Sequence, residues 1–382
     1  MEEARKQPSC TTSTEAKEIL PTENMKTPLQ SNARWLRTYK WWFQVAIYIL
    51  FLLSGQAVGT LLGRLYFDKG GNSTWLATLT LTMGFPMLLP FLFHSSLQNH
   101  NADYSRVQQP SVLVLTSIYV FLGLCTAGDS VLYSLGLKYL PVSTYSLICA
   151  SQLAFNAVFA FFLNAQKLTF FIINSLVLLT ISSIILVIHN DTEDSSNNSK
   201  NKYTLGIICT VAASALYAFV LSFTELMFQK ILKSKTFRVI IDLTFYESLV
   251  ATLAIVVGLF ASGEWKSLKS EMQDFRLGKV SYIMTFLWTG ISWQVFNIGC
   301  NGLIFKVSSL FSNVISVVGL PVDPVLAVVV FHDKVTAAKV VSLLLALWGF
   351  MSYAYQQYLD DLKAKAKRKC PREVTEDSIT EI

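Results

Sequence analysis

Ten long apolar stretches occupy the chain between Trp41 and about Gln356, and no soluble domain interrupts them. The hydrocarbon core of a bilayer is about 30 Å thick, so a helix needs about 20 mostly apolar residues to cross it. Lipid offers the backbone no hydrogen-bond partners, so segments of this length pair their polar groups internally as helices. The sequence therefore predicts an all-α, polytopic membrane protein whose function lies in what its helices enclose.

The expected spans form two halves of five transmembrane helices each. The spans are Trp41–Gly63, Trp75–Phe93, Val112–Ser134, Thr144–Leu163, Phe170–Ile188, Tyr203–Leu226, Ile240–Ala261, Tyr282–Cys300, Leu303–Val330 and Ala337–Tyr355. The expected organisation is a disordered cytoplasmic tail over 1–40, a first half over 41–188, an outside loop over 189–202, a second half over 203–356 and a basic cytoplasmic tail over 357–382. Only 15% of the residues are charged, against about 25% in an average soluble domain.

The distribution of basic residues predicts that both tails are cytoplasmic. Of the 31 Lys and Arg residues, 20 fall in the tails and in the loops on their side of the membrane. Cytoplasmic segments carry such an excess, so we read the net charge of +6 as a topological bias and not as a nucleic-acid surface. The three N-x-[ST] sequons begin at Asn72, Asn190 and Asn197, and all fall in loops expected outside.

Cysteine and histidine argue against several function classes. Four of the six cysteines are single residues inside expected spans, no C-x-x-C occurs, and the four histidines lie at span ends or in loops. We therefore expect no disulfide framework, no metal site and no cofactor. A membrane-embedded enzyme is disfavoured because it would need clustered His or Asp in the bilayer. No G-x-x-x-x-G-K-[ST] motif occurs, so ATP-driven transport is not expected.

Two acids inside the expected spans are candidates for proton coupling. Asp129 lies in the third span and Glu247 in the seventh. An acid at a helix centre costs about 2.5–3.5 kcal/mol, so it normally faces a cavity or a partner. The structural alternatives are an ion pair between Asp129 and Arg64, and a hydrogen-bonded packing role for Glu247. Asp323, between two prolines of the ninth span, is expected to satisfy backbone groups that the prolines free.

Uncharged polar residues at helical spacing are candidates for substrate binding. Gln152 and Asn156 are four residues apart in the fourth span, and Trp293 and Asn297 are four apart in the eighth, so each pair shares a helix face. Amides match the donor–acceptor edge of a purine, and an indole offers a stacking face to a heteroaromatic ring. The alternative is interhelical hydrogen bonding, worth about 0.6 kcal/mol per bond on average.

The first span carries Gly55, Gly59 and Gly63 at four-residue spacing, with Gln56 beside them as a further binding candidate. Small residues at this spacing let helix backbones approach closely, so packing is the favoured role of the glycines. Prolines in the second and ninth spans predict kinks there.

A weak internal similarity relates the segments 136–169 and 302–336. Each begins with Gly-Leu, continues through a Ser-containing helix start and ends on a polar-Lys-apolar-Thr sequence. The two segments enter the membrane from opposite sides, because each half has an odd number of spans. This pattern is typical of the inverted repeats of alternating-access carriers.

Several stretches share the pattern of one known family. They are Ser54–Tyr66, Gly70–Leu76, Ser151–Asn156, Leu163–Lys167, Ser262–Trp265, Ser292–Val295 and Ser308–Ser316. At these residues the chain resembles the purine permease family of plants, part of the drug/metabolite transporter superfamily, and the resemblance extends from Trp41 to Leu362. It implies ten helices, proton-coupled uptake and substrates such as adenine and cytokinins, while relatives also carry alkaloids and forms of vitamin B6. Asp323 departs from the pattern, which has an apolar residue before the second proline.

The sequence-based interpretation is a secondary transporter of a small planar heterocycle, with a proton and the lipid bilayer as its other partners. The expected substrate-binding residues are Gln56, Gln152, Asn156, Trp293 and Asn297, and the expected proton-coupling residues are Asp129 and Glu247. The alternatives are a drug/metabolite-type carrier of another metabolite, such as an alkaloid, a vitamin B6 form or an amino acid. Nucleotide sugars are disfavoured because the spans have almost no Lys or Arg to bind phosphate. The plasma membrane is favoured over an internal membrane.

Overall fold

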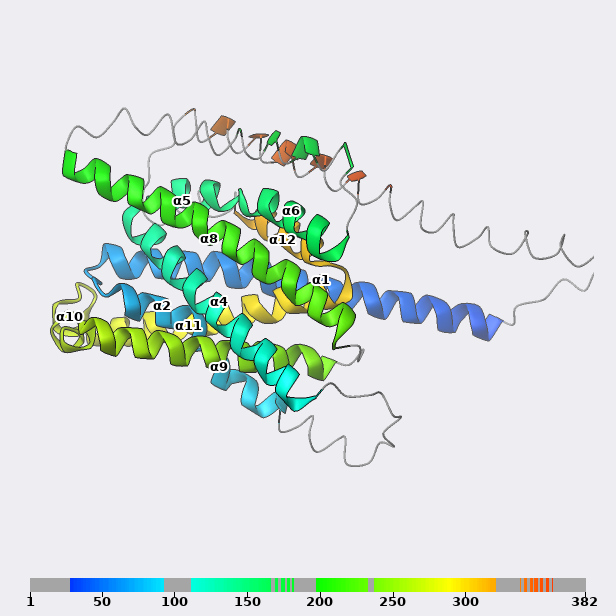
Figure 1. Cartoon of the computed structure of the whole chain (residues 1–382), viewed down its shortest axis with the longest axis horizontal. Helices are drawn as coiled ribbons and strands as arrows, with labels where there is room; N and C mark the ends of the chain where they lie inside the picture. The colour runs from blue at the N-terminus through cyan, green and yellow to red at the C-terminus, as the bar shows by residue number, and fades with distance from the viewer. Residues whose placement is uncertain are drawn as a thin grey trace, which may run out of the picture. The chain divides into compact units, whose positions relative to one another are not determined.

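The computed structural model in Figure 1 describes residues 28–92, 111–165, 197–232 and 237–320, with scattered residues between 169 and 181 and between 337 and 359. All regular elements in those ranges are helices. They are α1 (Pro28–Asp68), α2 (Thr74–Thr82), the 3-10 helix η1 (Phe85–Leu88), α4 (Val112–Tyr139), α5 (Val142–Cys149), α6 (Gln152–Asn164), α8 (Asn197–Lys230), α9 (Phe237–Ser262), the 3-10 helix η3 (Glu264–Lys266), α10 (Leu268–Asp274), α11 (Gly278–Lys306) and α12 (Ser309–Gly319).

Five described segments are long and apolar enough to cross a membrane. They are Tyr39–Asp68, Thr74–Leu92, Val112–Tyr139, Asn201–Lys230 and Phe237–Ser262. The prediction of an all-α, multi-pass membrane protein is confirmed by these segments. The fifth and tenth expected spans, and the prolines of the ninth, fall largely or wholly outside the described residues.

Helix boundaries differ most from the sequence-based expectation at three places. Helix α1 begins at Pro28, within the expected tail, and α8 begins at Asn197, within the expected outside loop. Helix α11 continues through Gly302 to Lys306, although a turn was expected there. Gly302 is a packing position, because a Cβ there would lie 2.5 Å from the ring of Tyr48 in α1.

Two expected spans are interrupted helices. The second ends its α-helix at Thr82 and continues as η1 around Pro86, in agreement with the expected kink. The fourth is divided into α5 and α6 at Ala150–Ser151. No proline or glycine lies there to predict this break. Asn313 of α12 donates from Nδ2 to the carbonyl oxygen of Gln152 at 3.1 Å, so a side chain from a distant helix binds the chain beside this break.

Helices α1 and α11 pack closely through small residues. A Cβ on Gly55 would lie 2.5 Å from the carbonyl oxygen of Ser292, and a Cβ on Gly299 would lie 2.6 Å from the backbone nitrogen of Leu52. Those contacts are with backbone, which cannot move aside as a flexible side chain can. The first-span glycines therefore serve packing, as their spacing favoured.

We expect Gly55→Ala to lower the thermal midpoint of unfolding, because the added methyl group forces α1 away from α11. Overpacking of this kind typically costs about 1–3 kcal/mol. The matched control is Gly128→Ala in α4, where the added Cβ would lie 3.6 Å from Leu216 at ordinary contact distance. The measurement is the thermal midpoint of detergent-solubilised protein; equal midpoints for the two variants would contradict the prediction.

Helices α4 and α8 pack closely on each other. Helix α4 packs against α2, α8 and α9, while α6 packs against α8 and α12, and α11 packs against α2, α9 and α12. Helices of the first expected half (α2, α4 and α6) therefore contact helices of the second (α8, α9, α11 and α12).

A buried carboxylate fixes the loop that leads into α2. Glu271 of α10 accepts hydrogen bonds from the hydroxyl of Tyr66, from the hydroxyl of Tyr282 at 3.1 Å and from the backbone nitrogen of Ser73 at 3.1 Å. Glu264 accepts from the Ser73 hydroxyl at 2.6 Å. This network holds the start of α2, and no local pattern in the sequence predicts it.

Candidate functional site

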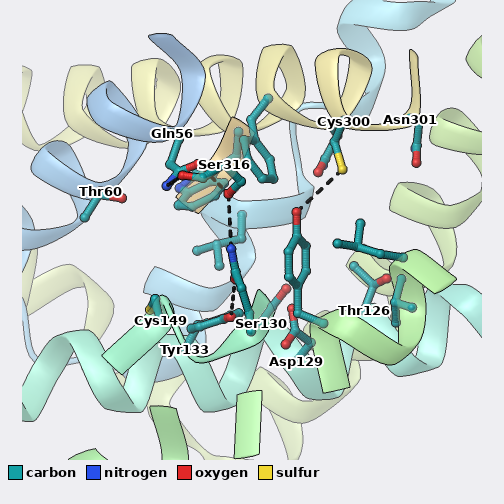
Figure 2. Close-up of a pocket in the computed structure, with 18 of the residues that line it drawn as sticks. Gln56, Thr60, Thr126, Asp129, Ser130, Tyr133, Cys149, Cys300, Asn301 and Ser316 are labelled. Atoms are coloured by element: carbon teal, nitrogen blue, oxygen red, sulfur yellow. Dashed lines mark hydrogen bonds between the residues drawn. The ribbon is translucent and has the colours of Figure 1, made fainter. Parts of the chain in front are cut away.

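A cavity lies between helices of both halves, and Figure 2 shows the side chains that surround it. Helices α1, α2, α4, α5, α6, α8, α9, α11 and α12 all contribute to its lining. Among the sequence-predicted residues, the lining includes Gln56, Asp129, Gln152, Glu247, Trp293 and Asn297. Six of the seven candidates thus lie around one cavity, although they come from five different helices.

A chain of hydrogen bonds joins the two candidate glutamines through Ser316. The hydroxyl of Tyr133 donates to Oε1 of Gln152 at 3.3 Å, and Nε2 of Gln152 donates to Oγ of Ser316 at 3.3 Å. The Ser316 hydroxyl donates to Oε1 of Gln56 at 2.8 Å, and Nε2 of Gln56 donates to the Ser316 carbonyl oxygen at 3.2 Å. This chain links α4, α6, α12 and α1 across one side of the cavity (Figure 2).

Trp293 and Asn297 reach the same cavity from α11. The Trp293 ring is fixed by close packing, because a Cβ on Gly59 of α1 would lie 2.8 Å from its Nε1. Its ring also meets Phe296 edge-on at 5.2 Å between centroids. The Asn297 amide has no hydrogen-bond partner in the described part of the chain, so it can donate to and accept from a ligand.

Asn156 does not line the cavity, which corrects the expectation that it would face it with Gln152. Its side chain is fully buried, and its Oδ1 accepts from the hydroxyl of Ser222 in α8 at 2.7 Å. Both amides lie in α6, but different helices contact them: α12 contacts Gln152 through Ser316, and α8 contacts Asn156 through Ser222. The interhelical role describes Asn156 better.

The two candidate acids face the cavity from neighbouring helices. Glu247 of α9 accepts a hydrogen bond from the hydroxyl of Thr126 in α4 at 2.7 Å. Asp129 lies one helical turn after Thr126 and is 7% exposed, and its Oδ1 is buried without a partner among the described residues. Asp129 is thus the acid whose hydrogen-bonding capacity is less completely satisfied.

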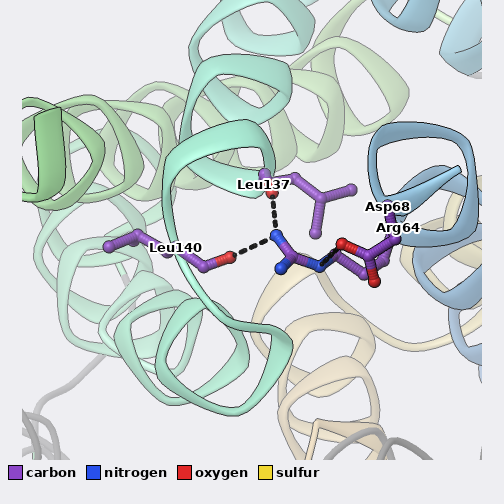
Figure 3. A network of polar contacts seen from close by, with 4 residues as sticks. All are labelled: Arg64, Asp68, Leu137 and Leu140. Atoms are coloured by element: carbon purple, nitrogen blue, oxygen red, sulfur yellow. Dashed lines mark hydrogen bonds and ion pairs between the residues drawn. The ribbon is translucent and has the colours of Figure 1, made fainter. Parts of the chain in front are cut away.

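The proposed ion pair between Asp129 and Arg64 is wrong. Nε of Arg64 pairs with Asp68 one turn later in α1 at 3.0 Å. Its Nη1 donates to the carbonyl oxygens of Leu137 and Leu140, at 3.2 and 3.1 Å (Figure 3). Arg64 therefore binds the end of α4, and Asp129 keeps its carboxylate toward the cavity.

An aromatic wall was missed by the sequence analysis. Tyr133 lies 6.0 Å from Tyr145 and 6.3 Å from Tyr217 between ring centroids, and all three line the cavity. The hydroxyl of Tyr217 is 3.5 Å from the Sγ of Cys300. A signal was available for Tyr133, because it follows Asp129 by four residues and thus shares its helix face.

The charges of the lining restrict what the cavity can bind. Asp129 and Glu247 are its only charged residues within the described chain, and no Lys, Arg or His is among them. No group of three or more potential metal ligands occurs in the described ranges. An acidic, amide-rich and aromatic lining suits a neutral or cationic heterocycle and disfavours a phosphate-bearing ligand.

A family model described as purine nucleobase transmembrane transport matches residues 43–363. This chain belongs to that family. Probable purine permease 10 of Arabidopsis thaliana is 56% identical over 328 residues, which cover 86% of this chain and 84% of the relative. Purine permease 21 of Arabidopsis thaliana is 54% identical over 334 residues, covering 87% and 85%. The resemblance to plant purine permeases is therefore confirmed.

Membership in this family identifies the chain as an integral membrane transporter and not as an enzyme. A crystal structure of a protein aligns with 82% of this chain and 96% of its own, with a TM-score of 0.50 and 14% identity. A likeness at that identity concerns the fold alone.

Proposed function

We propose that this chain is a proton-coupled carrier of purine nucleobases and related planar heterocycles, cytokinins among them. The observation that carries the proposal is one cavity lined by amides, aromatic rings and two acids. Gln56, Gln152 and Asn297 would read the polar edge of the heterocycle, and Trp293 would cover its face. A site that pairs amide donors and acceptors with a ligand discriminates strongly against ligands that lack them.

The proposed architecture is ten helices in an inverted repeat of five plus five. The packing of the described helices supports it, because contacts occur in related pairs. Helix α1 packs on α11 through Gly55 and Gly299, and α8 packs on α4 through Gly136, where a Cβ would meet Thr210. Helix α2 contacts α9 and α6 contacts α12, which are the pairs that an inverted repeat places at its pseudo-twofold axis.

Asp129 is the proposed proton-binding residue, with Glu247 as its neighbour. The titratable groups that interact with Asp129 are Glu247 of α9, Tyr217 of α8, Tyr145 of α5, and Tyr133 and Cys125 of its own helix. A carboxyl group that faces a transport cavity can gain and lose a proton as access alternates. The unpartnered Oδ1 of Asp129 favours it over Glu247, which Thr126 binds.

We place both tails in the cytoplasm and the protein in the plasma membrane. The excess of Lys and Arg on the side of the tails supports this orientation. A C-terminal epitope tag in sealed right-side-out vesicles should then resist added protease, and digestion of that tag would reverse the assignment.

The function is tested by uptake of labelled adenine into cells that lack their own purine uptake. Unlabelled purines and cytokinins should compete, whereas amino acids and nucleotide sugars should not. Competition by alkaloids or vitamin B6 forms alone, with no adenine uptake, would assign the cavity to another heterocycle. The control is the same cells with empty vector.

A further inference from the structure

Arg64 binds a helix end that neither the proposed substrate site nor the proton site uses. It lies one turn before the end of α1, and its guanidinium donates to the Leu137 and Leu140 carbonyls where α4 ends and α5 begins (Figure 3). The last carbonyls of a helix lack internal partners and carry the negative end of its dipole. A cation with several fixed donors therefore holds the α4–α5 hairpin to α1.

Glu225 makes the corresponding contact with opposite charge. It lies near the end of α8, is 6% exposed, and accepts from the backbone nitrogen of Ser309 at 3.0 Å and from its hydroxyl. It also accepts from Nδ2 of Asn164 at 3.0 Å and Nε2 of Gln229 at 2.9 Å. All of these partners donate to Glu225, so a carboxylate, which only accepts, fits the site. A glutamine at this position would turn its own NH₂ group toward some of these donors. Because Ser309 begins α12, Glu225 holds the α11–α12 hairpin at the positive end of a helix.

The two contacts lie at opposite ends of the helix bundle. Gly206, early in α8, packs beside the Arg64-bound hairpin, because a Cβ there would lie 2.9 Å from Leu140. From Gly206 to Glu225 a helix advances roughly 28 Å at 1.5 Å per residue. That length is close to the thickness of a bilayer's hydrocarbon core.

The two hairpins are also equivalent parts of the internal repeat. One follows Gly136-Leu137 and the other follows Gly302-Leu303. The first contributes cavity residues from α4, and the second contributes Ser316 of α12. The cavity therefore lies between two hairpins, each bound by one buried or half-buried charge at its own end.

We propose that Arg64 and Glu225 are reciprocal positioning residues that hold the cavity closed at opposite ends. Arg64 must release the α4–α5 hairpin for the path to open at its end, and Glu225 must release the α11–α12 hairpin for the path to open at the other. The inference rests on the proposed alternating-access function. It follows that loss of either residue shifts the balance between the two open states, and that the two losses act in opposite directions.

The test measures access to the cavity from each side. Full-length protein in right-side-out and in inverted vesicles is treated with a membrane-impermeant thiosulfonate reagent, and modification of the cavity thiols of Cys149 and Cys300 is quantified by peptide mass spectrometry. Arg64→Gln should raise the rate of thiol modification from the Arg64 end about tenfold. Glu225→Gln should raise it from the opposite end by a similar factor. Each variant loses hydrogen bonds to a charged group, whose loss typically changes an equilibrium by about tenfold or more. The double variant should return toward the wild-type balance.

The matched control is Arg238→Gln, which removes another ion pair between residues four apart, Arg238 with Asp242 at 3.5 Å, that binds neither hairpin. It should leave both rates unchanged. Where a Gln variant gives too little membrane protein, Arg64→Lys and Glu225→Asp are measured instead. These variants should change the modification rates in the same direction but by a smaller factor. Equal increases from both sides, or no change in either variant, would overturn the proposal. Thiol modification does not depend on which substrate is carried. A failure of adenine uptake would therefore count against the proposed substrate and not against the proposed roles of Arg64 and Glu225.

Discussion

Replacement of Asp129 by Asn is expected to abolish accumulation of substrate against its gradient while leaving downhill exchange intact. One proton moved with each substrate contributes about 1.4 kcal/mol per unit of pH difference, which supports about tenfold accumulation. Asparagine keeps the shape of the side chain but cannot take up a proton. The internal-to-external ratio of labelled adenine should therefore fall to one at every external pH.

Asp242→Asn is the matched control for this experiment, because Asp242 lies in α9 with Glu247 but is paired with Arg238 and does not line the cavity. It should retain pH-dependent accumulation. Should both Asp129→Asn and Glu247→Gln retain it as well, the proton site lies elsewhere in the chain.

Trp293→Ala and Asn297→Ala are expected to raise the half-saturation constant for adenine by about tenfold to a hundredfold at normal protein levels. Loss of a buried hydrogen-bond partner costs about 1–3 kcal/mol, and the stacking face of an aromatic ring contributes a similar amount per base. Both side chains line the cavity, and the Asn297 amide is not engaged elsewhere in the described structure. Initial rates of uptake over a range of adenine concentrations give the constant.

Asn156→Ala supplies the contrast within the same set of sequence candidates. Its Oδ1 accepts from Ser222 away from the cavity, so its loss should lower the thermal midpoint and leave the half-saturation constant unchanged. An increase in that constant for Asn156→Ala, with none for Trp293→Ala, would exchange the roles we assign to them.

The length of the apolar stretches was enough to predict the five membrane-spanning helices found in the described part of the chain, because each must satisfy its backbone in lipid without help from the rest of the chain. Interruptions were harder to predict. Asn313 of α12 binds the chain beside the break at Ala150–Ser151, and Tyr48 of α1 packs against Gly302, where α11 continues. Such partners are far away in sequence, and no local pattern indicates them.

The site was predictable to a similar degree. Polar residues within apolar helices are costly, so Gln152, Trp293, Asn297 and the two acids could be selected by that cost and by their spacing. Ser316 could not, because a serine in a helix commonly bonds its own backbone. Its role as the link between Gln56 and Gln152 arises only when α1, α6 and α12 meet.

In the proposed site, the Ser316-centred chain of hydrogen bonds also limits how tightly the protein can bind its substrate. Gln56 and Gln152 already bond to Ser316, so an arriving heterocycle must exchange those bonds for its own, and only the small difference remains as binding energy. A ligand that presents a donor beside an acceptor can replace both bonds of an amide. A ligand with acceptors alone leaves the amide oxygen without a donor. The resulting modest affinity favours rapid release of the substrate on the far side of the membrane. A carrier that bound its substrate much more tightly would turn over slowly.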